Sequence, residues 1–110
     1  MNKVKKIVEG LQKYHIDIFE QTILGVRLPY TDFKIMIFLI ANSGEAVSRY
    51  DLIKQVIGGI ITSKAIDIHV TNIREAFKNK NSYDKRYPIK AIRNVGYQID
   101  PLLIRELKKK

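Results

Sequence analysis

The segment from Ser63 to about Lys78 constrains the fold of this chain more than any other. Large apolar residues recur in it at intervals of three and four, the spacing of one face of an α-helix. These residues are Ile66, Val70, Ile73 and Phe77. Ser63 is a suitable N-cap. Because this helix must bury its apolar face, the rest of the chain is expected to form the scaffold on which it packs.

A basic hairpin is expected after this helix. Asn79–Tyr87 is polar and lysine-rich, which is typical of a loop. Pro88–Ile92 and Val95–Ile99 then have the composition of two short strands. Asn94 in the turn and the following Gly96 both tolerate a positive φ. We therefore predict a β-hairpin, with Tyr97 anchoring it on the core.

The chain before Ser63 predicts a small sheet and two helices. Residues 14–28 contain short β-prone pieces and predict an antiparallel sheet. A helix is predicted at about Tyr30–Ala41, after Pro29 and before Asn42-Ser43-Gly44. Its expected inner stripe is Phe33, Met36, Ile37 and Ile40. Ser48 is expected to cap a second helix that ends near Ile57.

These patterns divide the chain into three parts. Residues 1–13 form an N-terminal extension with a helical stripe that Gly10 weakens. Residues 14–99 form one α+β domain, and residues 100–110 are expected to be a basic C-terminal tail. The stripe makes residues 1–13 a candidate dimerisation helix.

Composition favours a polyanionic partner. The 110 residues are 45% hydrophobic, enough for a core, and carry a net charge of +9. Residues 64–97 hold eight basic and three acidic residues, so +5 of the excess lies there. Nucleic acid fits best and an anionic membrane surface second, whereas a merely solubilising charge stays open.

Several other classes of function lack support in the sequence. There is no cysteine, so a reducing cytoplasm fits, and no apolar run is long enough to span a bilayer. His15 and His69 have no metal-ligand spacing, and Gly58-Gly59 lacks the lysine of a phosphate-binding loop. We expect no metal, no cofactor, no membrane partner and no enzymatic activity.

The outer face of the helix at Ser63–Lys78 carries candidate DNA contacts. Ile68 lies opposite the inward stripe, where it could pack on thymine methyl groups. Asn72 can pair with adenine, and Lys64 can neutralise a phosphate or reach guanine. Thr71 and Lys78 are weaker candidates on the same face. The face could equally be solvated, with one isolated surface isoleucine.

The hairpin adds a second candidate contact. Arg93 stands at its tip between Lys90 and Asn94, and arginine suits a narrow minor groove. The alternatives are a solvated tip or a salt bridge to a carboxylate such as Asp67.

Three segments together resemble the winged-helix effector domain of OmpR/PhoB-type response regulators. They are Leu28-Pro29-Tyr30-Thr31-Asp32-Phe33, then Ser48-Arg49-x-x-Leu52, then Ile66-Asp67-Ile68-His69-Val70-x-x-Ile73-Arg74 with Ile89-x-x-Ile92-Arg93-x-x-Gly96-Tyr97. The resemblance covers about residues 14–99. It implies a winged helix-turn-helix with a four-stranded N-terminal sheet, three helices and a C-terminal hairpin wing.

The resemblance also implies roles for single residues. Lys64 and His69 match backbone-contacting positions, and so do Ser48 and Arg49 at the start of the second helix. Ile68 and Asn72 match base-facing positions, and Arg93 matches the wing arginine. Arg74 matches a basic position that touches DNA or braces the helix.

This chain departs from the family pattern in three places. Thr71-Asn72 replaces a common arginine pair, which favours A·T-rich over guanine readout. The loop Gly58–Ser63 is short, and Pro29 stands where a threonine cap is common. About a dozen residues precede the match, too few for a receiver domain. We therefore expect a standalone domain that aspartyl phosphorylation does not switch.

The sequence thus predicts a cytoplasmic, sequence-specific regulator of transcription that binds double-stranded DNA as a homodimer. The resemblance implies direct repeats as its target. The alternative is a winged-helix adaptor that docks on RNA polymerase or another regulator.

Overall fold

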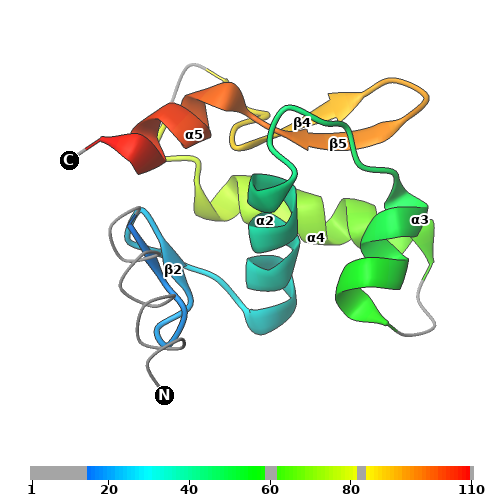
Figure 1. The fold of residues 1–110 in the computed structure, drawn as a ribbon, viewed down its shortest axis with the longest axis horizontal. Coiled ribbons are helices and arrows are strands. Elements are labelled where there is room, and N and C mark those ends of the chain that lie inside the picture. The colour runs from blue at the N-terminus through cyan, green and yellow to red at the C-terminus, as the bar shows by residue number, and fades with distance from the viewer. Residues whose placement is uncertain (1–14, 59–61, 82–83, 110) are drawn as a thin grey trace.

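The computed structural model describes residues 15–58, 62–81 and 84–109. In this part of the chain, a small sheet is followed by helices, a hairpin and a final helix (Figure 1). The elements are β1 (Ile16–Asp17), β2 (Thr22–Ile23), β3 (Val26–Arg27), α2 (Tyr30–Ala41), α3 (Arg49–Leu52), the π-helix η1 (Ile53–Ile57), α4 (Ser63–Ala76), β4 (Ile89–Ile92), β5 (Gly96–Ile99) and α5 (Pro101–Lys108). The predicted α+β architecture is confirmed. The extension at residues 1–13 lies outside the described residues.

The N-terminal sheet is antiparallel, in the order β1-β2-β3. Ile23 pairs with Ile16 on one side and with Val26 on the other. Ile16 and Ile23 are buried, so the sheet contributes one face to the core. Four strands were expected from the family resemblance, whereas the described residues contain three in this sheet.

Helix α2 has the predicted bounds but not the predicted inner face. Phe33 and Met36 are buried as expected, but Ile37 and Ile40 are only half-buried. Ile35 and Leu39 are fully buried in their place. The helix is apolar almost all round, so helical spacing alone could not select the face that packs.

The second helix begins as predicted. The Ser48 hydroxyl accepts a hydrogen bond from the Asp51 amide at 3.0 Å, which caps α3. The helix then widens into η1 and ends at Gly58, whose φ of +64° is left-handed.

The inward stripe predicted for α4 is confirmed in full. Its members are all 0% exposed: Ile66, Val70, Ile73 and Phe77. The N-cap is Thr62 rather than the predicted Ser63, because the Thr62 hydroxyl accepts from the Ala65 amide at 3.2 Å. The helix ends at Ala76, two residues before the predicted Lys78. It packs on α2 and α3 (Figure 1).

The hairpin pairs β4 with β5 through a turn in which Asn94 has a φ of +65°. Each strand begins one residue later than predicted, at Ile89 and Gly96. The backbone of Tyr97 pairs with that of Val47, which joins the hairpin to the chain before α3. A Cβ at Gly96 would lie 2.0 Å from the Val47 carbonyl oxygen, so this approach requires glycine.

The prediction that residues 100–110 form a basic tail is wrong, because most of this segment is a helix. Residues Pro101–Lys108 form the helix α5, capped by the Asp100 side chain with proline in the first turn. Leu103 and Leu107, one turn apart, are buried in the common core. Apolar burial therefore makes this segment part of the domain, although its outer face remains basic.

Leu103→Ala tests this correction. Leu103 is 0% exposed, so truncation should leave a cavity and lower the free energy of unfolding by about 2–4 kcal/mol. Arg105→Ala, on the exposed face of the same helix, should change it by less than about 0.5 kcal/mol. Urea denaturation of both variants makes the measurement. Equal and small effects would show that α5 is not packed.

Candidate nucleic-acid interface

An exposed row runs along α4, opposite its buried stripe. Lys64, Ile68 and Asn72 are spaced four residues apart, so they lie one above the other on the helix. All three are exposed, and 55% of Ile68 is open to solvent. Lys64 and Asn72 make no hydrogen bond or ion pair with the described residues, so their polar groups are available. The structure thus brings together the three best candidates for base or phosphate contact.

Two neighbours of this row already have partners. The Thr71 hydroxyl donates to the Asp67 carbonyl oxygen at 3.0 Å, within the helix. Lys78 pairs with Glu75 at 2.6 Å, and this hydrogen bond raises the pKa of Lys78. Their polar groups are therefore less free than those of Asn72 and Lys64.

The hairpin tip projects a second set of candidate residues. Arg93 and Asn94 are exposed, and Val95 beside them is 48% exposed. Lys90, on β4, is half-buried. Arg93 forms no ion pair with a described carboxylate, and the salt bridge to Asp67 considered above is not formed. The guanidinium at the tip is free to meet a ligand.

Asp67 instead joins α4 to α3 and to the hairpin. Its Oδ1 accepts from Arg49 Nε at 2.6 Å and from the Tyr97 hydroxyl at 2.5 Å. Burial opposes ionisation of Asp67, but hydrogen bonds from Tyr97 and Arg49 outweigh it and lower the pKa of Asp67. The Arg49 guanidinium also lies 5.0 Å from the centre of the Tyr97 ring.

Two residues predicted at the DNA backbone are therefore engaged inside the protein. The Arg49 side chain is held by Asp67, and the Ser48 hydroxyl caps α3. The Ser48 side chain thus caps the start of α3, and the Arg49 side chain ties α3 to α4.

The Arg74 side chain braces α4 against the start of β4, which is one of the two roles that the family resemblance implies. Its Nη2 donates to the Ile89 carbonyl oxygen at 2.8 Å, and its Nε lies 3.1 Å from the carbonyl oxygens of Ile89 and Arg86. These bonds tie α4 to the start of β4. The Arg74 guanidinium thus donates its hydrogen bonds to backbone carbonyl oxygens.

His69 lies on the other flank of α4 and contacts α2. Its Nδ1 is 2.7 Å from Oδ1 of Asp32, whose side chain is 5% exposed. No local pattern in the sequence indicates this pair or the Asp67–Tyr97 pair, because the partners are 37 and 30 residues apart. Both acidic residues were missed as positioning residues for that reason.

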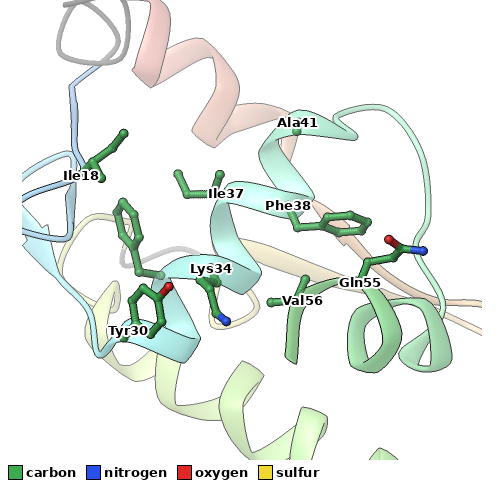
Figure 2. A pocket seen from close by; sticks show the side chains of 9 residues that line it. Ile18, Tyr30, Lys34, Ile37, Phe38, Ala41, Gln55 and Val56 are labelled. Atoms are coloured by element: carbon green, nitrogen blue, oxygen red, sulfur yellow. The ribbon is translucent and has the colours of Figure 1, made fainter. Parts of the chain in front are cut away.

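An apolar pocket of about 440 Å³ lies away from this surface. Its wall comes from the turn after β1, from α2 and from η1, and Figure 2 shows the side chains around it. The lining residues are Ile18, Tyr30, Phe33, Lys34, Ile37, Phe38, Ala41, Gln55 and Val56. No residue of α4 or the hairpin lines it, so it is separate from the candidate interface.

The described residues offer little for other chemistry. They contain no group of three or more potential metal ligands. No helix among them is both long and apolar enough to cross a bilayer.

Comparison with known proteins places this arrangement of helix and hairpin in a family. Residues 20–99 match the family described as "Transcriptional regulatory protein, C terminal", the OmpR/PhoB-type DNA-binding domain. The chain belongs to this family. The resemblance found in the sequence is thereby confirmed, as is the winged-helix class. Domains of this family bind DNA in transcription regulation and are not enzymes.

Individual relatives agree with this assignment. The phosphate regulon regulator PhoB of Rhizobium meliloti (strain 1021) is 31% identical over 77 residues, which are 68% of this chain and 33% of PhoB. The OmpR/PhoB-type domain described here thus spans about a third of that relative's length. The DNA-binding domain of RstA from Klebsiella pneumoniae has a TM-score of 0.60 at 26% identity, covering 78% of this chain and 82% of its own. The DNA-binding domain of AdeR, solved in complex with an intercistronic region, has a TM-score of 0.60 at 23% identity, covering 68% and 74%.

Asp67→Asn tests the link between α4, α3 and the hairpin. The variant loses the charge that receives the Arg49 and Tyr97 bonds, so the free energy of unfolding should fall by about 1 kcal/mol at neutral pH. The folded-state pKa of Asp67 is lowered, so its contribution is present above the ordinary carboxyl range and is lost as pH falls through the lowered value. Glu75→Gln, in an exposed pair on the same helix, is the control and should have almost no effect.

Chemical denaturation at several pH values measures both variants. As pH falls below about 4, the stabilities of Asp67→Asn and wild type should approach each other. A constant difference down to acid pH would contradict the role of the ionised carboxylate.

Proposed function

We propose that this domain is a sequence-specific binder of double-stranded DNA that regulates transcription, with α4 in the major groove and the hairpin at the adjacent minor groove. The observation that carries the proposal is the exposed row Lys64–Ile68–Asn72, which stands opposite a fully buried stripe. The exposed Ile68 side chain would gain free energy if it were removed from water. In a major groove it would meet thymine methyl groups beside an adenine that Asn72 can read.

The charges support the same orientation. Lys64 and Arg93 lie at the ends of the two exposed elements, with cationic groups not neutralised by described residues. Lys78, just past the C-terminal end of α4, and Lys90, on β4, add positive charge to the same two segments, and His69 lies on the flank of α4. Arg74 is left out of the proposed contacts because backbone carbonyls hold its guanidinium. The complex of AdeR with an intercistronic region is a precedent in the same fold.

The target is proposed to be A·T-rich, since Asn72 and Ile68 both suit A·T pairs. Binding as a homodimer on direct repeats follows the family expectation. In-vitro selection of bound duplexes from a random pool tests both, because it returns the site, its spacing and its symmetry together. Selected sequences without an A·T preference would contradict the assignment of these two side chains.

Phosphate contact by the free cations predicts a steep dependence of affinity on salt. The logarithm of the association constant should fall linearly with the logarithm of salt concentration. Removing one phosphate contact, as in Lys64→Ala, should reduce this slope by about 1 and weaken all sequences alike. Fluorescence anisotropy with labelled duplexes makes the measurement. The alternative adaptor function, with Ile68 as an anchor for RNA polymerase or another regulator, would be favoured by absent DNA binding at every salt concentration.

Asn72→Ala should act differently from Lys64→Ala. Loss of a base contact should cost about 1–3 kcal/mol on the selected site and relax the preference at one base pair. On an unrelated duplex the same variant should bind almost as wild type does. Competition titrations with the selected and the unrelated duplex separate the two cases. Uniform loss on both duplexes would assign Asn72 to the backbone instead.

A further inference from the structure

Asp32 is a buried charge placed behind the proposed DNA surface. Its side chain is 5% exposed, and its described side-chain partner is the His69 ring, at 2.7 Å from Nδ1. Asp32 lies in the first turn of α2, where the helix N-terminus favours a negative charge. Because a buried carboxylate without a donor is costly, the Asp32–His69 contact is best satisfied with the proton on Nδ1.

The other ring nitrogen of His69 is open. His69 is 30% exposed and lies on α4 three residues before Asn72. Its Nε2 has no hydrogen bond to the described residues. No side-chain nitrogen or oxygen among them is both buried and without a partner. Nε2 is therefore accessible to solvent, on the edge of the row proposed to face DNA.

The protonation state decides what Nε2 can do there. A neutral imidazole carries one N–H, so a ring that donates from Nδ1 to Asp32 presents a lone pair at Nε2. A phosphate oxygen is also an acceptor and would be repelled. Only the imidazolium donates at both nitrogens.

We propose that His69 donates Nε2–H to a DNA phosphate as an imidazolium, with Asp32 as the positioning residue, so that DNA binding takes up a proton. This inference rests on the proposed DNA-binding function. The proton comes from solvent, and no bond other than the N–H bond is made or broken. Affinity for DNA therefore increases as pH falls.

The other charged groups packed around α4 are engaged elsewhere. Arg49 of α3 is held by Asp67, and Arg74 is held by the carbonyl oxygens of Arg86 and Ile89. Of the charged groups on α2, Asp32 is the one in contact with the ring. The second histidine, His15, is bonded instead to the Lys109 carbonyl oxygen. Among the described residues, Asp32 is thus the charged group in contact with the His69 ring.

The test is the affinity for a duplex between about pH 5.5 and about pH 8 at constant ionic strength. For wild type, log Kd should increase with pH, with a slope approaching about one across part of this range. His69→Gln keeps a donor toward Asp32 but cannot titrate, and its slope should be near zero. In Asp32→Asn the amide can donate to Nδ1, which leaves Nε2–H on a neutral ring, so the slope should also collapse. His15→Gln is the matched control and should retain the wild-type slope.

A measurement on the free protein separates this inference from the proposed function. Nitrogen-15 chemical shifts of the ring should show neutral His69 as the Nδ1–H tautomer in wild type and not in Asp32→Asn. The Nε2–H tautomer in wild type would overturn the inference, as would a slope that survives in His69→Gln. Tight binding with no pH dependence would contradict the inference and would still support the proposed function. If no duplex binds at any pH, the proposed function fails and the inference fails with it. Circular dichroism of each variant confirms folding.

Discussion

One carboxylate, that of Asp67, holds the candidate interface in shape. It lies on α4 and receives hydrogen bonds from Arg49 on α3 and from Tyr97 on β5. A single acceptor thereby fixes two helices and the hairpin relative to one another. Arg74, about two turns along α4, adds bonds to the backbone at the start of β4. The position of the hairpin relative to α4 depends on these two side chains and on the close approach that Gly96 allows.

The second flank of α4 is held by a different element. At about 100° per residue, Asp67 and Arg74 fall on one side of the buried stripe and His69 on the other. His69 reaches Asp32 on α2, so α4 is clamped on both sides. The strip between the clamps contains Lys64, Ile68 and Asn72. Their exposure thus follows from packing on three sides of the helix.

The sequence predicted what depends on neighbouring residues. The stripe of α4, the Ser48 cap and the hairpin turn at Asn94 are local patterns, and the structure contains all of them. The prediction was wrong by one residue where two neighbouring side chains could both cap the same helix. Thr62 took the cap expected of Ser63, because both carry a hydroxyl and the Thr62 hydroxyl reaches the Ala65 amide.

Three further features were not predicted: the buried face of α2, the helix α5 and two contacts between distant residues. Helix α2 is apolar nearly all round, so its buried face depends on what packs against it. Helix α5 was missed although Asp100-Pro101 is a helix-start signal and Leu103 and Leu107 lie one turn apart. The lysines around them dominated the interpretation as a tail. The Asp32–His69 and Asp67–Tyr97 contacts join residues far apart in the sequence, which no local pattern could reveal.

The structure also divides the cations into two kinds, which net charge alone conceals. Arg49 and Arg74 have planar groups with several donors, suited to holding a carboxylate or several carbonyls, and both serve within the fold. Lys64 and Arg93 extend from α4 and the hairpin into solvent. A contact surface gains specificity when its readers are held still by residues that do not themselves read. By fixing α4 on both flanks, Asp32, Asp67 and the two bracing arginines reduce the freedom that Ile68 and Asn72 must lose on binding. Some of the cations behind the +9 net charge therefore hold the fold together, whereas others, such as Lys64 and Arg93, are exposed to solvent.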